Sequence, residues 1–208
     1  MKHKGILIVM SGFSGAGKGT IVKEMLNRFG DDYKLSISAT TRQPRKGEVD
    51  GKDYFFLTKD KFESMIEQDG FVEWAEYVGN YYGTPKKWVD EQLEQGNKII
   101  LEIEMQGALK VREKFKDALL LFITPPDYLT LKERLINRGT EDMETVRNRL
   151  KRAVKETEYI EQYNHVILNN SVVEAAEEIN DIVCREVEKR HMHEEFIENF
   201  INQYNTYK

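Results

Sequence analysis

The sequence predicts an α/β protein with a parallel sheet at its core, and two observations support this fold class. Three apolar runs, at 6–10, 98–104 and 118–124, have the continuous hydrophobicity of strands covered on both faces, and a weaker run lies at 165–168. Segments with helical periodicity lie between and after these runs. Strands that alternate with helices indicate a parallel sheet with helices on its faces.

The first predicted helix follows the first strand and carries its apolar residues on one face. These residues are Ile21, Val22, Met25, Leu26 and Phe29. A later helix is expected to begin at Thr84-Pro85, with the threonine as N-cap and the proline in the first turn, and to end at Gly96.

Further helices are expected in the second half of the chain. Asp127 is placed to cap a helix over 128–137, and Ser171 with Glu174 forms a capping box for the last long helix. The stretch 36–83 breaks the alternation of strands and helices. Its turn residues, aromatic residues and short alternating runs predict an inserted subdomain.

Composition restricts the class of protein. A chain of 208 residues, 40% of them hydrophobic, can bury the core of one domain. The formal net charge of −5 argues against broad nucleic-acid binding, so any anion site must gather positive charge locally. The single cysteine, Cys184, excludes an internal disulfide framework and suits a reducing compartment. We expect a cytoplasmic protein without a membrane span or signal peptide, since every apolar run is too short for either.

The segment GFSGAGKGT, residues 12–20, lies between the first strand and the first helix. This is the context of a phosphate-binding loop, in which glycines let successive N–H groups point at phosphate oxygens and the helix N-terminus adds its positive end. Lys18 is expected to reach the β- and γ-phosphates of a nucleoside triphosphate. Gly19 stands where this pattern has Ser or Thr, which leaves direct magnesium binding by Thr20 open. The expected nucleotide-binding residues are Gly12, Ser14, Gly15, Ala16, Gly17, Lys18, Gly19 and Thr20.

A second loop, SISATTRQPRKGEVDGKDYFF at 36–56, places Arg42 and Arg45 three positions apart around Pro44. Two guanidiniums in a polar, turn-rich loop suit a second anionic group away from the first loop. The Asn-Lys-x-Asp tetrapeptide of a GTPase guanine loop does not occur in the sequence, which favours a kinase over a GTPase.

Five segments, in this order and spacing, resemble the guanylate kinase family: SGFSGAGKGT, SATTRQPRKGEVDGKDYFF, FVEWAEYVGNYYGTP, LEIEMQGA and NRGTE. The resemblance runs from about Ile6 to Asn170. It implies a three-layer P-loop NTPase fold and transfer of the γ-phosphoryl group of ATP to GMP, giving ADP and GDP, with Mg²⁺ as cofactor. It also implies one domain with three parts: a core (1–35, 96–126 and 162–208), a GMP-binding region (36–95) and a lid (127–161).

The resemblance implies residues for GMP. Those near its phosphate are Ser38, Arg42, Arg45, Tyr54 and Tyr82. Glu73 is implied to read the base, with Thr84 near the guanine oxygen. A carboxylate can accept from the N1–H and 2-amino groups of guanine together, whereas adenine presents no such pair of donors. From the residues alone, the two tyrosines could equally pack a small sheet.

Glu102 and Glu104 are two positions apart on a predicted strand, so both side chains are expected on one side of it. P-loop proteins hold magnesium at a carboxylate near the end of such a strand, often through water. The family often has aspartates here, and the glutamate pair leaves open which carboxylate meets the metal and which organises the arginines. We expect Thr20 and Glu102 at the metal, and both glutamates among the GMP-binding residues.

The expected lid supplies arginines for the transfer step. The resemblance selects Arg134, Arg138 and Arg149, which join Lys18 and Arg42 in the expected catalytic set. It also implies that Asn169, after the last strand, contacts adenine.

A helix over 142–161 is expected to bury one stripe of residues, with Arg147 and Arg149 beside it. The stripe residues are Val146, Leu150, Val154 and Thr157. Arg152 lies nearly opposite this stripe and is therefore expected in solvent.

The expected small-molecule partners are ATP and GMP, with dGMP and the choice between monomer and homo-oligomer left open. Two alternatives are a catalytically inactive guanylate-kinase-like interaction module and a kinase for another nucleoside monophosphate. The first is disfavoured because the sequence retains Lys18, Arg42, Arg45, Glu73, Arg138 and Arg149. The resemblance fades beyond about Lys189, where an amphipathic segment could pack on its own core or against a partner. Its apolar residues are Phe196, Ile197, Phe200, Ile201 and Tyr204.

Overall fold

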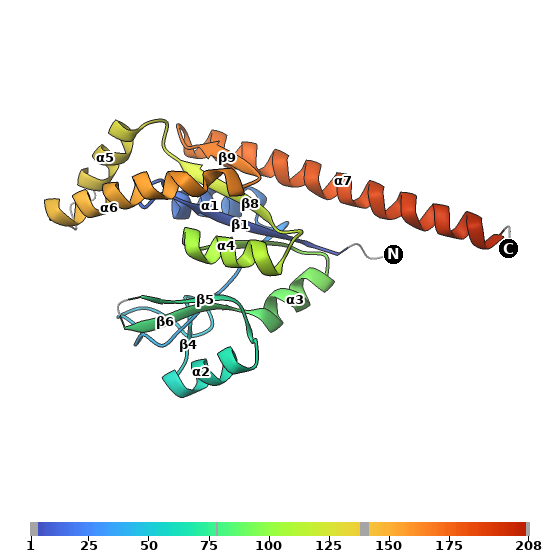
Figure 1. Ribbon diagram of the computed structural model, residues 1–208, viewed down its shortest axis with the longest axis horizontal. Helices are drawn as coiled ribbons and strands as arrows, with labels where there is room; N and C mark the ends of the chain where they lie inside the picture. Colours follow the sequence, from blue (N-terminus) through green and yellow to red (C-terminus); the bar gives the residue numbers. More distant parts are fainter. Residues whose placement is uncertain (1–3, 78, 138–141, 207–208) are drawn as a thin grey trace.

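The computed structural model of the protein describes residues 4–77, 79–137 and 142–206. Within these ranges, no helix combines the length and the apolar character that crossing a membrane requires. Two sheets organise the chain, and Figure 1 shows the smaller one, with helix α2 beside it, below the larger one.

The larger sheet has five strands in the order β2-β7-β1-β8-β9, and every neighbouring pair is parallel. β1 and β8 are almost completely buried, as expected for strands covered on both faces. This arrangement confirms the parallel α/β fold class. The edge strand β2 was not expected from the sequence. The strands are β1 (Ile6–Gly12), β2 (Tyr33–Leu35), β7 (Lys98–Glu102), β8 (Leu119–Thr124) and β9 (His165–Leu168).

Helices cover this sheet and connect its strands. α1 packs against α7, and α4 packs against β1. The helices are α1 (Lys18–Phe29), α3 (Lys86–Glu94), α4 (Met105–Lys114), α5 (Tyr128–Asn137), α6 (Met143–Glu156) and α7 (Val172–Thr206). Because parallel strands end at the same edge, the loops after β1 and β7 lie next to each other, which positions the candidate site.

The smaller sheet has four strands in the order β4-β3-β6-β5. Helix α2 packs on it through the ring of Phe62, which stacks on Phe71 at a centroid distance of 4.3 Å. The stretch 36–83 therefore has an apolar cluster of its own around these rings and Ala39. Its elements are β3 (Ala39–Thr40), β4 (Phe55–Phe56), α2 (Lys59–Glu67), β5 (Phe71–Tyr77) and β6 (Asn80–Pro85).

The helix expected over 142–161 is shorter than predicted and faces the core differently. α6 ends at Glu156, and a 3₁₀ segment follows from Thr157 to Gln162. Its buried residues are Val146, Leu150, Ala153 and Glu156, whereas Val154 is 60% exposed. The predicted and the observed buried stripes both contain Val146 and Leu150, so helical periodicity alone could not distinguish one stripe from the other. The last two stripe assignments were wrong.

Helix starts agree with the sequence in two of three cases. The Asp127 carboxylate accepts a hydrogen bond from the Thr130 N–H at 2.8 Å, as a cap should. Ser171 Oγ accepts from the Glu174 N–H at 3.4 Å at the start of α7. The prediction that Thr84 caps α3 was wrong, because β6 continues through Thr84 and Pro85 is the N-cap residue.

Candidate active site

The loop between β1 and α1 has the conformation of a phosphate cradle. Gly15 and Gly17 both have φ of +91°, a left-handed conformation that favours glycine. A Cβ at Gly17 would also lie only 2.4 Å from Asn169 Nδ2. Among the described residues, no side chain caps the N-terminus of α1, so its first N–H groups are placed to meet a ligand.

Lys18 lies folded over this loop. Its Nζ donates to the carbonyl of Gly12 at 2.8 Å and to that of Phe13 at 3.2 Å. The side chain of Phe13 is buried and meets Phe122 edge-on, with centroids 4.9 Å apart. The ammonium group therefore stays beside the glycines, while the neighbouring aromatic ring packs in the core.

Arg134, Arg149 and Asn169 meet the same loop from distant parts of the chain. Arg134 donates to the carbonyl of Asn169 at 2.9 Å and to that of Ala16 at 3.4 Å. Arg149 Nη1 donates to Ser14 Oγ at 2.5 Å. Asn169 is buried, and its Nδ2 donates to the Ala16 carbonyl at 2.7 Å.

Two of the three expected lid arginines thus lie at the loop. The third, Arg138, lies outside the described residues.

Glu102 ends β7 and approaches the start of α1. A Cβ at Gly19 would lie 3.4 Å from Glu102 Oε1, so the residue after Lys18 leaves room for this carboxylate. Desolvation raises the pKa of Glu102, although Lys18 and Lys23 act in the opposite direction.

Glu104 does not share the strand with Glu102, contrary to the expectation, because β7 ends at Glu102 and Glu104 is the N-cap residue of α4. Its carboxylate meets Arg152, whose Nη2 lies 2.6 Å from Glu104 Oε2. Arg152 Nε also donates to Glu156 Oε1 at 2.8 Å. Arg152 is exposed, as predicted, but it pairs with both carboxylates, which the sequence did not indicate.

Glu156 is the buried member of this network, with 5% of its surface exposed. Burial raises the pKa of Glu156, and the nearby Arg152 partly offsets that effect. A carboxylate buried at this depth needs a partner to remain ionised. Arg152 supplies it and at the same time ties α6 to the start of α4.

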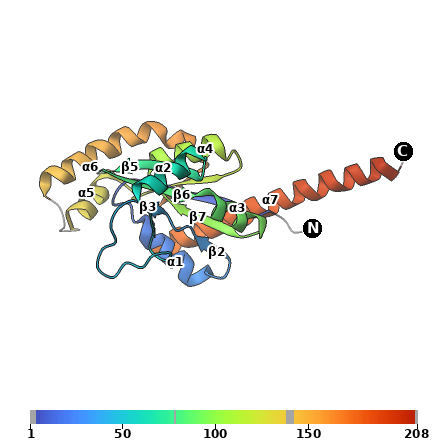
Figure 2. The same ribbon diagram turned by 90° about the horizontal axis from the view of Figure 1, so that it is seen from below.

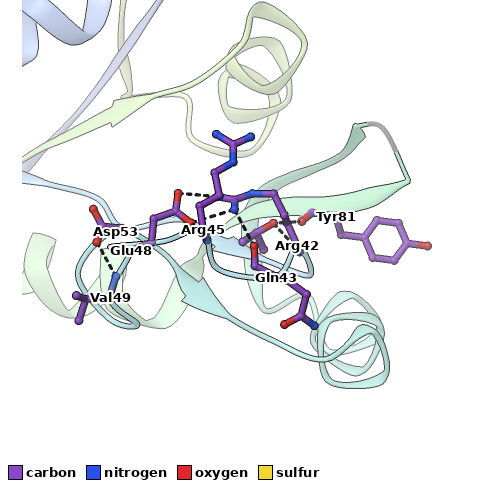
Figure 3. A network of polar contacts seen from close by, with 8 residues as sticks. Arg42, Gln43, Arg45, Glu48, Val49, Asp53 and Tyr81 are labelled. Atoms are coloured by element: carbon purple, nitrogen blue, oxygen red, sulfur yellow. Dashed lines mark hydrogen bonds and ion pairs between the residues drawn. The ribbon is translucent and has the colours of Figure 1, made fainter.

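The second loop holds an arginine–carboxylate pair that the sequence reasoning missed (Figure 3). Two nitrogens of Arg42 each lie 2.9 Å from a Glu48 oxygen, and the Arg45 N–H donates to the same carboxylate at 2.7 Å. The bond from Arg42 lowers the pKa of Glu48, and Glu48 raises that of Arg42. The Glu48 carboxylate occupies the position at which a bidentate anionic ligand would bind the Arg42 guanidinium. Its spacing of three residues from Arg45 was the available signal.

Two tyrosines and Ser38 complete this second group. The ring of Tyr54 lies 5.3 Å from Arg42 Cζ and 6.2 Å from the ring of Tyr82. The Ser38 carbonyl accepts from the Phe55 N–H at 2.9 Å, in the pairing of β3 with β4. Arg42 and the tyrosines thus lie together, while the side chain of Arg45 is exposed.

Glu73 is buried in β5, which excludes a solvated edge charge. Its Oε1 accepts from the Thr84 hydroxyl at 2.9 Å. A Cβ at Gly107, in the first turn of α4, would lie 2.9 Å from Oε2. Burial raises the pKa of Glu73, with Thr84 and Lys110 acting in the opposite direction. The Glu73 carboxylate is therefore a buried hydrogen-bond acceptor whose orientation is fixed by Thr84.

The junction between β7 and α4 connects the two halves of the site. Glu102, at its start, adjoins Gly19 of the phosphate cradle, and Gly107, at its end, adjoins Glu73. A site for a triphosphate and a site for a second polar ligand therefore flank one short segment. Sequence spacing could not have indicated the role of Gly107.

Comparisons with known proteins agree on one family. A family model described as guanylate kinase matches residues 4–186. A curated guanylate kinase from Caldanaerobacter subterraneus subsp. tengcongensis is 52% identical over 186 residues, covering 89% of this chain and 90% of the relative. One from Clostridium acetobutylicum is 50% identical, covering 89% of this chain and 88% of the relative. The crystal structure of guanylate kinase from Anaplasma phagocytophilum has a TM-score of 0.69 and 32% identity, covering 89% and 87% of the two chains.

Proposed function

The chain belongs to the guanylate kinase family, and from this premise we propose how its residues divide the phosphoryl transfer. It is a nucleoside monophosphate kinase that transfers the γ-phosphoryl group of ATP to GMP, giving ADP and GDP. The observation that supports the division of roles is the position of the phosphate cradle and the buried Glu73–Thr84 pair on either side of the β7–α4 junction.

ATP is proposed to bind at the loop 12–20. Its phosphates replace the two carbonyls now bonded to Lys18, so that Nζ moves onto the β- and γ-phosphates. Arg149 donates a hydrogen bond to Ser14 of this loop, which places its guanidinium close enough to neutralise charge on the transferred group. Arg134 and Asn169 brace the loop through the Ala16 carbonyl. We assign adenine contact to Asn169 as part of this proposal.

The GMP phosphate is proposed to take the place of the Glu48 carboxylate on Arg42. Both anions offer two oxygens to a planar guanidinium, so the geometry of the pair suits either. Arg45, Tyr54 and Tyr82 are placed to add donors around the phosphate. Ser38 and Glu104 are proposed to stand at the edge of the same ligand.

Glu73 is proposed to select guanine. Its ionised carboxylate can accept from N1–H and the 2-amino group together, while the Thr84 hydroxyl fixes its orientation. AMP would leave this buried acceptor without matching donors, at a cost of about 1–3 kcal/mol per unmade bond. The raised pKa of Glu73 implies that base recognition weakens in acid.

The residues present fit a magnesium ion, which we propose as cofactor. Mg²⁺ in kinases usually takes one or two carboxylates, substrate phosphates and several waters, which matches Glu102 beside Gly19 and the hydroxyl of Thr20. When bound, the ion would supply positive charge to the phosphates of ATP.

In the transfer step, an oxygen of the GMP phosphate attacks the γ-phosphorus of ATP. The bond from that phosphorus to the bridging oxygen breaks, and ADP leaves with the bridging oxygen. No side chain needs to remove a proton, because the attacking oxygen already carries negative charge. The chain's own contribution is alignment and neutralisation by Lys18, Arg42 and Arg149.

Water is the competing acceptor, so the two substrates must be enclosed before transfer. We propose that region 36–95 and region 127–161 close over the core segments 1–35, 96–126 and 162–208. The cytoplasm is the proposed location, supported by the free thiol of Cys184.

A coupled ADP-release assay with GMP, dGMP, AMP, UMP and dTMP tests the function, and turnover with GMP should exceed that with AMP, UMP and dTMP by orders of magnitude. Equal kcat/KM for GMP and AMP would contradict it. Glu73→Gln should lower the ratio of kcat/KM for GMP over AMP by about tenfold or more, corresponding to one lost paired acceptor. An unchanged ratio would exclude Glu73 as the base reader.

A further inference from the structure

The second half of α7 projects beyond the body of the molecule as a bare helix (Figures 1 and 2). We call residues 187–206 the tail; it lies beyond residue 186, where the family match ends. Its large apolar side chains are exposed, from 51% for Ile201 to 69% for Met192. The set is Met192, Phe196, Ile197, Phe200, Ile201 and Tyr204.

These side chains form one continuous surface. At about 100° per residue, all six fall within one half of the helix circumference. That half continues the face which Ile179 and Val183 bury against the core in the first half of α7. Phe196 and Phe200 already contact each other, with ring centroids 6.1 Å apart. Because the helix runs straight away from the body, the core that covers its first half leaves the tail uncovered.

The charges of the tail argue against a lipid surface as the cover. Glu195 and Glu198 lie on the half of the helix opposite the apolar residues. Interfacial helices usually carry Lys and Arg on that face, and carboxylates are repelled by anionic lipids.

We propose that the tail pairs with the tail of a second copy of this chain, in antiparallel orientation. Four of the six apolar residues are spaced symmetrically about position 198, so a two-fold axis there brings Phe196 opposite Phe200 and Met192 opposite Tyr204. The same axis sets Ile197 and Ile201 level with Asn199 and Glu195 of the second copy. A parallel pair would instead set Lys189 and Arg190 of the two tails side by side. Antiparallel pairing places these basic residues at opposite ends of the pair.

The area available approaches that of the smallest specific interfaces. Phe196, Phe200 and Tyr204 are each more than 60% exposed, and burying an aromatic side chain removes about 150–250 Å². Two chains then offer roughly 800 Å² from rings alone. The aliphatic residues of both tails bring this toward the roughly 1,200 Å² at which specific interfaces begin.

A cavity at the base of the tail fits the far end of a partner's helix. It measures about 590 Å³, and its apolar lining residues include Leu7, Leu93 and Phe115. Its charged lining residues include Lys4, Lys116 and Arg190 together with Asp117 and Glu194. With the axis at position 198, the partner's Tyr204 and last turn arrive beside Met192, next to this cavity. The ring meets the apolar wall, and the bare carbonyls of the last turn meet the cations.

Light scattering after size exclusion tests the pairing on the full chain. The wild type at 50 µM should have twice the chain mass of 24.4 kDa. Phe200→Glu should raise the dimer dissociation constant at least 100-fold. Asn202→Glu adds the same charge on the opposite side of the helix and should leave the mass doubled. Both variants should keep wild-type helicity and kinase turnover.

A monomeric wild type, or a Phe200→Glu variant that remains as dimeric as the wild type, would overturn the proposal. Vesicles of phosphatidylserine and phosphatidylcholine provide a second arm. Co-sedimentation of a monomeric wild type with these vesicles, lost in Phe200→Glu, would show that a membrane covers the tail and would also overturn it.

Cysteine cross-linking tests the orientation, in a Cys184→Ser background. Ile197→Cys lies within one residue of the axis and should form a disulfide with its copy. Tyr204→Cys should not, because its copy would lie about 18 Å away along the helix axis. Cross-linking of Tyr204→Cys with its own copy would indicate parallel tails and refute the antiparallel pairing. Kinase turnover is unaffected by either outcome, so failure here is distinct from failure of the proposed function.

Discussion

Replacing Thr84 by valine removes the hydroxyl that donates the 2.9 Å bond to the buried carboxylate of Glu73. The substitution keeps the size and shape of the side chain, so the cost comes from hydrogen bonding. A buried charged acceptor that loses a donor costs about 1–3 kcal/mol. For a chain of this length, each kcal/mol lowers the melting temperature by about 2–4 °C.

The same change should weaken GMP recognition selectively. Without the hydroxyl, the orientation of Glu73 is no longer fixed and its pKa rises further above the ordinary value, since Thr84 opposes the effect of burial. We expect KM for GMP to rise about tenfold, the equivalent of 1.4 kcal/mol, while KM for ATP stays unchanged.

Steady-state kinetics and thermal unfolding of matched variants provide the assay. Thr84→Ser restores the hydroxyl and should recover most of both losses. Thr157→Val removes an exposed hydroxyl that bonds the Val154 carbonyl, so it should change stability by about 0.5 kcal/mol or less. If Thr84→Val matches Thr157→Val in melting temperature and leaves KM for GMP unchanged, the reasoning about the buried pair is refuted.

Three further substitutions test other parts of the site. Lys18→Ala should lower kcat by about 100-fold or more with little change in melting temperature, and near-normal turnover would remove the lysine from the transfer step. Gly107→Ala places a methyl group 2.9 Å from Glu73 Oε2, so KM for GMP should rise while KM for ATP stays constant; equal changes in both would point to general disruption. The pKa of Glu156 is raised above its ordinary value of 4.5 by burial, so its contribution to stability is present below about pH 4.5 and is lost as pH rises through the folded-state pKa. Glu156→Gln cannot undergo this loss, and its melting temperature should therefore exceed that of the wild type at pH 8 by more than at pH 4.5; calorimetry showing the reverse would contradict the role of burial.

The glycine-rich loop and the second, arginine-bearing loop could be recognised in the sequence because their residues are neighbours in the chain. Glycines at 12, 15 and 17 with Lys18 form a continuous cradle, and Arg42 stands three positions from Arg45 in one loop. Glu73 was predicted through the family resemblance, and its burial is consistent with that reading.

Pairs that join distant residues could not be predicted. Arg152 meets Glu104 across 48 positions, and periodicity indicated the exposure of Arg152 but not this ion pair. Thr84 was expected as a helix cap, but the strand continued through it and brought its hydroxyl to Glu73. Glu48 was overlooked because its spacing from Arg45 does not show that its carboxylate also binds the Arg42 side chain, six positions away.

The sequence by itself determined the parallel strands and the phosphate loop, since runs of apolar residues and glycine spacing act over a few neighbouring positions. Only the tertiary structure decided the partners of Glu104 and Glu73, because Arg152 and the Thr84 hydroxyl reach them from separate elements. It also decided that the apolar face of α7 continues past the core, because the length of a straight helix relative to the body cannot be read from its periodicity.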